Sequence, residues 1–251
     1  MQHIIELIDY SQEFFMLHFL GIGAQKAGTT WLHEMLSQHP QLILPAAKEL
    51  HYWDKQFPTS PVQAYSNFFQ HTDCYEGEIT PAYASLPITT IQVIYQHFPE
   101  LRLIYSLRNP IQRAWSAACM FLTKSQMELE EASDQWFLDH FYSKGSRLRG
   151  DYETCIRNWT SVYPKQNLLL LDYDLIKSEP STVLSLCCQH LGIKHFTDQQ
   201  LKRMLLDSKV FAGKGYELRP TLKQALIHLY TPQIQSLSRY LDKDFSHWIH
   251  E

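Results

Sequence analysis

A short glycine-rich stretch near the start of the chain has the residue types of an anion-binding site. Residues 19–31 read FLGIGAQKAGTTW, in which three glycines lie around Lys26 and two threonines follow. The apolar first half predicts a buried strand, and the part from residue 29 onward has the spacing of an amphipathic helix. Glycine lets backbone N–H groups approach a phosphate, a helix N-terminus adds partial positive charge, and lysine adds a full charge. We therefore predict an anion-binding loop formed by Lys26, Ala27, Gly28, Thr29 and Thr30.

The position of the lysine distinguishes this loop from a Walker A motif. That motif, G-x-x-x-x-G-K-[ST], has its lysine directly after the second glycine. Gly23 and Gly28 have the required spacing, but Thr29 follows Gly28 and the lysine comes earlier, at position 26. A glycine-rich turn of this kind can also be an ordinary tight turn. Its interpretation therefore depends on the other reactive side chains.

An arginine and a serine form a second candidate anion site. They lie in LRNPIQRAWS, residues 107–116, where Arg108 follows the clearest apolar run and Ser116 comes eight residues later. Pro110 is typical of the first turn of a helix, which places Ser116 about two turns into that helix. Arg108 and Ser116 can then contact one anion near the edge of a sheet. The alternative is that the two residues only cap a helix.

A third group of reactive side chains lies in KELHYWD, residues 48–54. It contains Lys48, Glu49, His51 and Asp54. The spacing does not match a helical zinc site, because no second histidine follows at i+4, and we expect no metal. The alternative is a solvated polar loop without a chemical role.

The elements that must position these residues alternate between strands and helices. We predict strands at residues 16–22, 42–44, 75–79, 101–107 and 167–171, and helices at 29–38, 60–70, 88–97, 110–121, 152–162, 180–191, 198–206 and 222–240, the last with a break near Pro232. This alternation predicts a single α/β domain over residues 1–251, with a central, mostly parallel sheet of about five strands and helices on both faces. Ligands of such sheets bind beyond the carboxyl ends of the strands, where the three groups of residues should converge.

Two segments stand outside this pattern. Residues 1–16 form a weakly patterned peripheral segment, and residues 123–150 are polar and of mixed charge, typical of an insertion or lid. KELHYWD and the TPAY stretch at residues 80–83 are expected in loops that follow strands. Lys144, Arg147 and Arg149 in the second segment could meet an anionic acceptor or form a solvated surface.

The composition indicates a folded protein with a large core. Hydrophobic residues make up 45% of the 251 residues and charged residues 19%, which argues against global disorder. The net charge of −4 and the pI near 6.3 argue against nucleic acid as a partner. The five cysteines form no C-x-x-C pair, and neither a signal peptide nor a membrane span is recognisable. We expect a cytoplasmic protein with reduced thiols.

The first two motifs resemble those of sulfotransferases that use 3′-phosphoadenosine 5′-phosphosulfate (PAPS). QKAGTTWL, residues 25–32, is similar to the loop that binds the 5′-phosphosulfate, and residues 108–116 match R-[DN]-P-x-x-R-A-x-S. The resemblance implies a P-loop-like fold in which Lys26 and the N–H groups of residues 27–30 hold the phosphosulfate, with Lys26 also catalytic. It further implies that Arg108 and Ser116 bind the 3′-phosphate, that PAP is the product, and that no metal is required. Trp31, Trp115 or Tyr216 could contact the adenine, although core packing is the usual role of tryptophan.

Two further stretches resemble carbohydrate sulfotransferases. Residues 211–216, FAGKGY, are similar to a K-G loop that closes over the nucleotide, which implies binding by Gly213, Lys214, Gly215 and Tyr216. KELHYWD is similar to the E-x-H-F-F-D stretch of heparan sulfate glucosaminyl sulfotransferases, in which the glutamate is regarded as the base. This implies that Glu49 is the base with His51 as its helper or substitute, and that Lys48, Asp54, Thr80 and Tyr83 contact the acceptor. EITPAY, residues 78–83, is similar to E-K-[ST]-P-x-Y, but isoleucine replaces the lysine, which argues against heparan sulfate itself.

We therefore expect a PAPS-dependent sulfotransferase that transfers a sulfuryl group in line to a hydroxyl of a sugar, lipid or small metabolite. Two alternatives remain. A P-loop kinase or NTPase is suggested by NLLLLDYD, residues 167–174, which is similar to a Walker B strand that ends at Asp172. The other is a non-catalytic nucleotide- or carbohydrate-binding module with the same fold.

Overall fold

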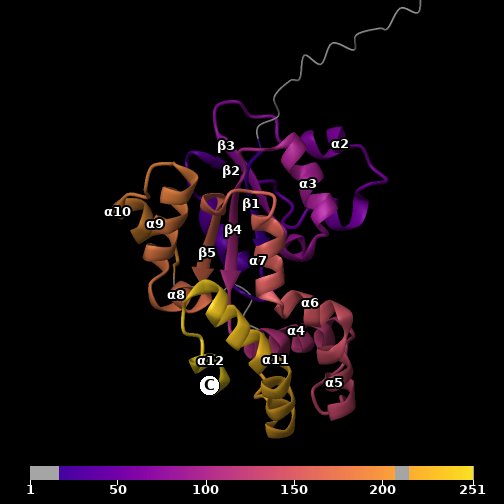
Figure 1. Cartoon of the computed structure of the whole chain (residues 1–251). Coiled ribbons are helices and arrows are strands. Elements are labelled where there is room, and N and C mark those ends of the chain that lie inside the picture. The colour runs from indigo at the N-terminus through magenta and orange to yellow at the C-terminus, as the bar shows by residue number, and fades with distance from the viewer. Residues whose placement is uncertain (1–16, 207–214, 251) are drawn as a thin grey trace, which may run out of the picture.

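Five parallel strands lie at the centre of the structure (Figure 1). This computed structural model describes residues 17–206 and 215–250. The strand order is β2-β3-β1-β4-β5, and every neighbouring pair is parallel. The strands are β1 (Leu17–Gly23), β2 (Leu42–Ile43), β3 (Tyr75–Ile79), β4 (Arg102–Leu107) and β5 (Leu168–Asp172). Their carboxyl ends consequently lie at the same end of the sheet, where ligands of parallel sheets bind.

Helices cover both faces of the sheet because successive strand side chains point to opposite faces. In β1, Phe19 packs in the apolar cluster of one face, whereas Leu20 and Ile22 pack in that of the other. Figure 1 shows α9 and α7 on opposite sides of the sheet. The first face is covered by α1 (Thr29–Leu36), α8 (Tyr173–Ser178), α9 (Pro180–Leu191) and α10 (Asp198–Arg203), and the second by α2 (Val62–Ser66), α3 (Ile88–His97) and α7 (Tyr152–Thr160).

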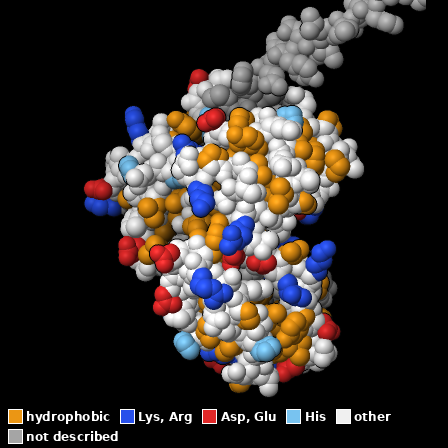
Figure 2. Space-filling model, viewed as in Figure 1, with side chains coloured by type: hydrophobic (Ala, Val, Ile, Leu, Met, Phe, Trp, Pro, Cys, Tyr) orange, Lys and Arg blue, Asp and Glu red, His pale blue; other side chains and the backbone are white. Residues whose placement is uncertain are grey.

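A further group of helices lies beyond the carboxyl ends of the strands, in the lower part of Figure 1. It consists of α4 (Pro110–Lys124), α5 (Asp134–Tyr142), α6 (Lys144–Gly150), α11 (Pro220–Leu241) and α12 (His247–His250). In this group α4 packs against α5, α6, α11 and α12. Figure 2, in the same view, shows Lys, Arg, Asp and Glu side chains at the level where these helices meet the sheet.

The predicted fold is confirmed, with all five strands parallel rather than most of them. The predicted bounds of β3, α3 and α9 coincide with the observed ones. The peripheral segment 1–16 lies outside the described residues. No helix in the described ranges is long and apolar enough to cross a membrane.

The segment 123–150 is more regular than its polar composition predicted. α4 extends to Lys124, and α5 and α6 occupy most of the segment's second half. Ser133 and Ser143 cap these two helices by accepting hydrogen bonds from the N–H groups of Trp136 and Ser146, each at 3.2 Å. Both helices are short, so their few buried positions gave no clear helical period in the sequence.

The predicted break in the long C-terminal helix is wrong. α11 continues through Pro232, although proline removes one helical hydrogen bond. Tyr230, Ile234 and Leu237, on either side of the proline, are all buried. Packing of this apolar face keeps the helix continuous.

Two stretches predicted as loops contain short helical turns. Within KELHYWD, residues Tyr52–Gln56 form a single wide turn of π-helix, η1, that buries Tyr52 and Trp53. After β3, residues Pro81–Ser85 form a 3₁₀ turn, η2. A third such turn, η3 (Lys165–Asn167), precedes β5.

Candidate active site

The predicted anion loop connects β1 to α1. Gly28 precedes α1 in a left-handed conformation, with φ of 79°, and a Cβ atom there would lie 2.7 Å from Cδ1 of Ile176. Only glycine fits such a position without strain. The first hydrogen bond of the helix runs from the N–H of Leu32 to the carbonyl oxygen of Gly28 at 3.0 Å. The N–H groups of residues 29–31 therefore have no acceptor within the helix, and no side chain caps it.

One N–H group that was predicted to bind the anion already has a hydrogen-bond partner in the chain. The N–H of Ala27 donates to the carbonyl oxygen of Ala24 at 3.1 Å, so it closes the loop on itself. The anion-binding groups of the loop are consequently the N–H groups at the start of α1 and the Lys26 side chain.

Arg108, at the end of β4, is bound to the same loop. Its Nη1 donates to the carbonyl oxygen of Lys26 at 2.8 Å. Its own carbonyl oxygen accepts a hydrogen bond from the Tyr152 hydroxyl at 2.7 Å, which fixes the backbone there. Burial lowers the pKa of Lys26, and the positive charge of Arg108 lowers that pKa further. The site therefore holds two neighbouring cations, and within the described ranges neither forms an ion pair with a carboxylate.

Ser116 lies on α4, partly buried, on the turn that precedes Cys119. Burial raises the pKa of the Cys119 thiol to about 11, and the nearby charge of Lys26 opposes this shift. Residues three apart share a helix face, so Ser116 lies on the same side of α4 as Cys119. The structure brings Lys26 and Arg108 together, and the assignment of Ser116 to the same anion stays a prediction.

The predicted nucleotide-closing loop is only partly described. Gly213 and Lys214 lie outside the described residues, whereas Gly215 is exposed and has a φ of 70°. The carbonyl oxygen of Tyr216 accepts a hydrogen bond from the indole N–H of Trp115 at 2.9 Å. This hydrogen bond holds the backbone at Tyr216 against α4, the helix that carries Ser116.

The Glu49 loop, residues 48–54, contains four ionisable side chains in contact with one another. Lys48 Nζ contacts one carboxylate oxygen of Glu49, and His51 Nε2 lies 3.3 Å from the other. On the opposite side of its ring, His51 Nδ1 lies 2.9 Å from Oδ2 of Asp54. Glu49 also opposes the lowering of the Lys26 pKa, so the loop that carries Glu49 lies near the anion loop.

Glu78 is a buried carboxylate beneath this loop that the sequence analysis did not single out. Its Oε1 accepts from the hydroxyls of Tyr65 at 2.7 Å and Tyr83 at 2.8 Å. Its Oε2 accepts from the hydroxyl of Thr80 at 2.6 Å and, more weakly, from the N–H of Leu50 at 3.4 Å. Burial raises the pKa of Glu78, although all of these hydrogen bonds oppose the shift.

This arrangement corrects the expected role of Thr80 and Tyr83. Both side chains are 0% exposed, and both hydroxyls donate to Glu78. They are therefore placed to fix the backbone beneath the Glu49 loop, and they do not face an acceptor. The motif was located correctly, but sequence spacing could not show which of its polar side chains point inward.

Trp31 also points away from the predicted nucleotide. Its ring is buried in the apolar cluster beneath α9, and its indole N–H donates to the carbonyl oxygen of Leu206 at 3.0 Å. Tyr173, by contrast, is a site residue that the sequence analysis missed. The Arg108 guanidinium lies 4.5 Å above its ring, and the same ring lies 3.3 Å from the Cβ position of Gly28. The sequence could have indicated Tyr173 by its position directly after β5, at the same end of the sheet as the other site residues.

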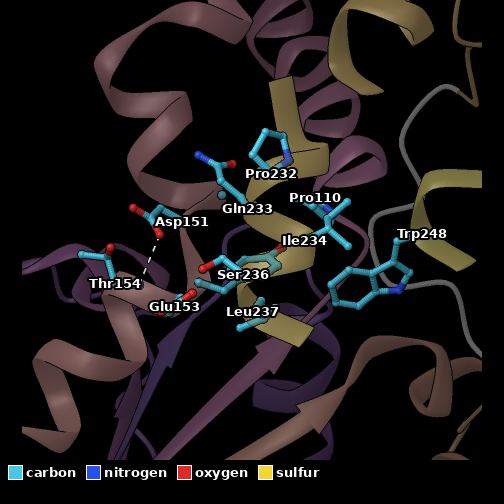
Figure 3. A pocket seen from close by; sticks show the side chains of 12 residues that line it. Pro110, Asp151, Glu153, Thr154, Pro232, Gln233, Ile234, Ser236, Leu237 and Trp248 are labelled. Carbon is cyan, nitrogen blue, oxygen red and sulfur yellow. Dashed lines mark hydrogen bonds between the residues drawn. The ribbon is translucent and has the colours of Figure 1, made fainter. Parts of the chain in front are cut away.

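Two cavities lie near these residues. One, of about 550 Å³, reaches Gln25 in the anion loop and extends between α4, α5 and α6. The other, of about 300 Å³, lies between α7, α11 and α12 behind the Arg108 backbone, and Figure 3 shows Asp151, Gln233, Ser236 and Trp248 around it. The lining of this second cavity includes none of the predicted site residues. Across the described ranges, no three His, Cys, Asp or Glu side chains are grouped as metal ligands.

Comparison with known proteins identifies the family. The model of the sulfotransferase domain family matches residues 18–218. The chain belongs to the sulfotransferase family. The matched range includes the anion loop, the Glu49 loop, and both Arg108 and Ser116. The family predicted from QKAGTTWL and LRNPIQRAWS is thus confirmed.

Individual relatives of this sulfotransferase are distant. The bifunctional heparan sulfate N-deacetylase/N-sulfotransferase 1 of Caenorhabditis elegans is 24% identical over 243 residues, which cover 90% of this chain and 28% of that relative. The solved sulfotransferase of Alicyclobacillus acidocaldarius has a TM-score of 0.71 at 23% identity and covers 92% of this chain and 98% of its own. Mouse sulfotransferase SULT7A1, solved in complex with PAP, has a TM-score of 0.60 at 16% identity, with 91% of this chain and 89% of its own covered. These structures share the fold. The chain spans about a quarter of the length of the curated heparan sulfate relatives.

Proposed function

We propose that this sulfotransferase moves a sulfuryl group from PAPS to an acceptor hydroxyl, with Glu49 as the base. Family membership gives the class of reaction, and the backbone supports the choice of residues. Five non-glycine residues in the described ranges have positive φ, and three of them are Lys26, Glu49 and His51. Such conformations cost roughly 1–3 kcal/mol each and cluster at functional sites. The three residues that the chemistry requires are thus held in conformations that folding alone disfavours.

The anion loop and the pair Arg108 and Ser116 are assigned to different ends of the nucleotide. Arg108 Nε is buried and, within the described residues, has no hydrogen-bond partner. A bound phosphate would supply this partner and would neutralise the repulsion between Arg108 and Lys26. We assign Lys26 and the N–H groups at the start of α1 to the phosphosulfate, and Arg108 and Ser116 to the 3′-phosphate. Lys214 is assigned by resemblance alone.

The chain's own residues then perform two tasks. PAPS supplies the sulfuryl group, and PAP is the product. Sulfuryl transfer, like phosphoryl transfer, depends on alignment and charge stabilisation. Lys26 and the N–H groups of α1 neutralise charge on the departing phosphate. Glu49 takes the proton of the acceptor hydroxyl, a role typically worth ~10²–10⁴-fold in rate.

His51 positions this base. Its ring lies between Glu49 and Asp54, so Asp54 fixes the ring and the ring fixes one carboxylate oxygen. Lys48 holds the other oxygen. A carboxylate oxygen has more than one lone pair, so Glu49 can still accept a proton in this arrangement.

Nucleotide binding and label transfer test the proposal. PAP should bind the protein in the absence of added metal, as measured by calorimetry, and PAPS with radioactive sulfur should label an acceptor in pooled extracts. Lys26→Met should weaken PAP binding roughly 10–100-fold, because hydrogen bonds to charged groups contribute ~1.5–3 kcal/mol. Lys165→Met, at an exposed lysine near the opposite end of β5, serves as the control.

The outcomes separate the alternatives. Binding of ATP with Mg²⁺ in place of PAP would indicate a P-loop kinase or NTPase. Tight PAP binding without transfer to any acceptor would indicate a binding module. Unchanged PAP affinity in Lys26→Met would contradict the assignment of the loop.

A further inference from the structure

We infer that the acceptor is a small ring-bearing hydroxy acid whose anionic group binds Arg113 and Arg149. This inference rests on the proposed function and deepens it by naming the acceptor class. The binding place is the cavity of about 550 Å³ that reaches Gln25, the residue before Lys26. Cavities of this size bind small molecules.

Arg113 is a buried cation whose hydrogen bonds are incomplete. It lines the cavity and is 0% exposed. Its Nη2 donates to the carbonyl oxygen of Ser146 at 3.2 Å and to the hydroxyl of Tyr230 at 3.3 Å. Its Nε and Nη1 have no partner in the part of the chain that the structure describes. Burying a charge without a counterion is costly, so this guanidinium favours an anion from outside the chain.

Arg149 brings a second positive charge to the same cavity. Its Nη1 donates to the carbonyl oxygen of Gly145 at 3.0 Å, and its buried Nε has no partner among the described residues. Burial lowers the pKa of Arg149, and the positive charge of Arg113 lowers it further. Neither arginine forms an ion pair with a carboxylate in the described ranges.

The remaining charges of the lining do not cancel these two. Lys124 adds a third cation at the exposed rim, and Asp139, also exposed, is the acidic residue of the lining. Burial lowers the pKa of His140, and the charges of Arg113 and Arg149 lower it further, which disfavours a positive charge on this ring. The cavity therefore has an excess of positive charge although the whole chain has a net charge of −4.

Aromatic rings line one side of the cavity. The rings of Trp136 and His140 are nearly parallel, at 9° with centroids 6.2 Å apart, and Phe121 lies 5.5 Å from His140. All three residues line the cavity. Such a surface favours a planar apolar ring, which an anionic polymer of sugars does not offer.

The cavity also faces the two reacting parts of the site. Gln25 connects it to Lys26. At the other end, α6, which carries Arg149, packs against η2, and η2 packs against η1, the turn that contains Asp54. An acceptor whose anion is held by Arg113 and Arg149 would thus lie beside the anion loop and near the turn that contains Asp54.

Binding of unreactive probes tests this class directly. Phenylacetate and phenylacetamide share one ring and differ in charge, and both lack a hydroxyl that could be sulfated. NMR titration should show phenylacetate binding roughly 10–100-fold tighter, because a hydrogen bond to a charged group contributes ~1.5–3 kcal/mol. Arg149→Met should reduce this ratio to below about 3-fold, whereas Arg147→Met, at an exposed arginine of the same helix, should leave it unchanged.

Turnover provides the second measurement. In the wild type, kcat/KM with PAPS should fall in the order para-hydroxyphenylacetate, para-hydroxyphenylacetamide, tyramine. Equal binding of the charged and neutral probes, or a preference that survives Arg149→Met, would overturn the inference. Because the binding measurement needs neither PAPS nor transfer, it decides the acceptor class even if the proposed function fails. Sulfation of the neutral and anionic phenols at equal rates would leave the proposed function intact and reject the acceptor class.

Discussion

Two glutamates at the same end of the sheet show how differently one residue type can be used. Glu78, in β3, is 2% exposed, and four donors occupy its two oxygens. Glu49, after β2, has a side chain that is 36% exposed, and its backbone is left-handed with φ of 65°. Its oxygens meet ionisable groups, Lys48 and His51, instead of hydroxyls. The first carboxylate is a fixed part of the interior, and the second is the one that we propose as the base.

The two carboxylates are also connected. The N–H of Leu50, the residue after Glu49, donates to Glu78 at 3.4 Å. Glu78 additionally binds the hydroxyl of Tyr83, which in turn accepts a hydrogen bond from the N–H of Tyr52 at 3.1 Å. The buried glutamate is therefore a positioning residue for the loop that carries the exposed one.

The largest expected effect separates the two glutamates by activity. Glu49→Gln should reduce kcat by ~10²–10⁴-fold, because the amide cannot accept the proton of the acceptor hydroxyl. PAP affinity and the free energy of unfolding should stay close to those of the wild type, since Glu49 is partly exposed. Steady-state kinetics and PAP calorimetry measure the two quantities. Normal turnover in this variant would remove Glu49 as the base.

The second-largest effect separates Glu78 from Glu49 by the free energy of unfolding. Glu78→Gln should lower the free energy of unfolding by ~1–3 kcal/mol, because an amide nitrogen cannot accept from Leu50 and the charge-assisted bonds are lost. Urea denaturation measures this change, with the exposed Glu34→Gln as the control. Turnover per folded molecule should fall less than in Glu49→Gln. A stability equal to the wild type would show that the buried network contributes nothing to folding.

A smaller effect tests which side chain takes the proton. His51→Gln should reduce kcat about 10-fold, because the 3.3 Å contact that orients one oxygen of Glu49 is lost while Lys48 still holds the other. PAP affinity should not change. A loss as large as that of Glu49→Gln, with the acidic limb of the pH–rate profile abolished, would instead make His51 the base.

The smallest effect concerns pH. Burial raises the pKa of Glu78 above its ordinary value of 4.5, so the folded protein keeps this proton to higher pH than the unfolded chain does. Between 4.5 and the raised pKa the folded state binds more protons, and this group's contribution to stability therefore falls as pH rises. The slope of stability against pH in that window should become more positive in Glu78→Gln. An identical slope in the two proteins would contradict the raised pKa.

Sequence reasoning succeeded where chemistry depends on order along the chain. The strand that ends at Leu107 and the helix that begins at Pro110 determine the relation of Arg108 to Ser116, and both are visible in the sequence. The same holds for the anion loop, whose strand, glycines and helix are consecutive. Long elements with a clear period, such as α3 and α9, were predicted with their observed bounds.

Sequence reasoning failed where the direction of a side chain depends on packing between distant segments. Trp31 comes directly after the anion loop, yet its ring packs in the apolar cluster under α9, and its indole N–H binds the carbonyl oxygen of Leu206, a residue distant in the sequence. Thr80 and Tyr83 point inward because Glu78 is buried beneath them. Arg113 and Arg149 lie on different helices, and the sequence does not show that they share a cavity. Short helices such as α5 bury too few positions to reveal their period.

The left-handed backbone at positions 26, 49 and 51 has a consequence for protein engineering. Glycine adopts this conformation without strain, and asparagine does so more readily than lysine, glutamate or histidine. A library selected for heat resistance alone should therefore replace these three residues early and lose activity as it gains stability. Positions where thermal selection and activity selection choose opposite residues would thus map the site without any knowledge of the acceptor.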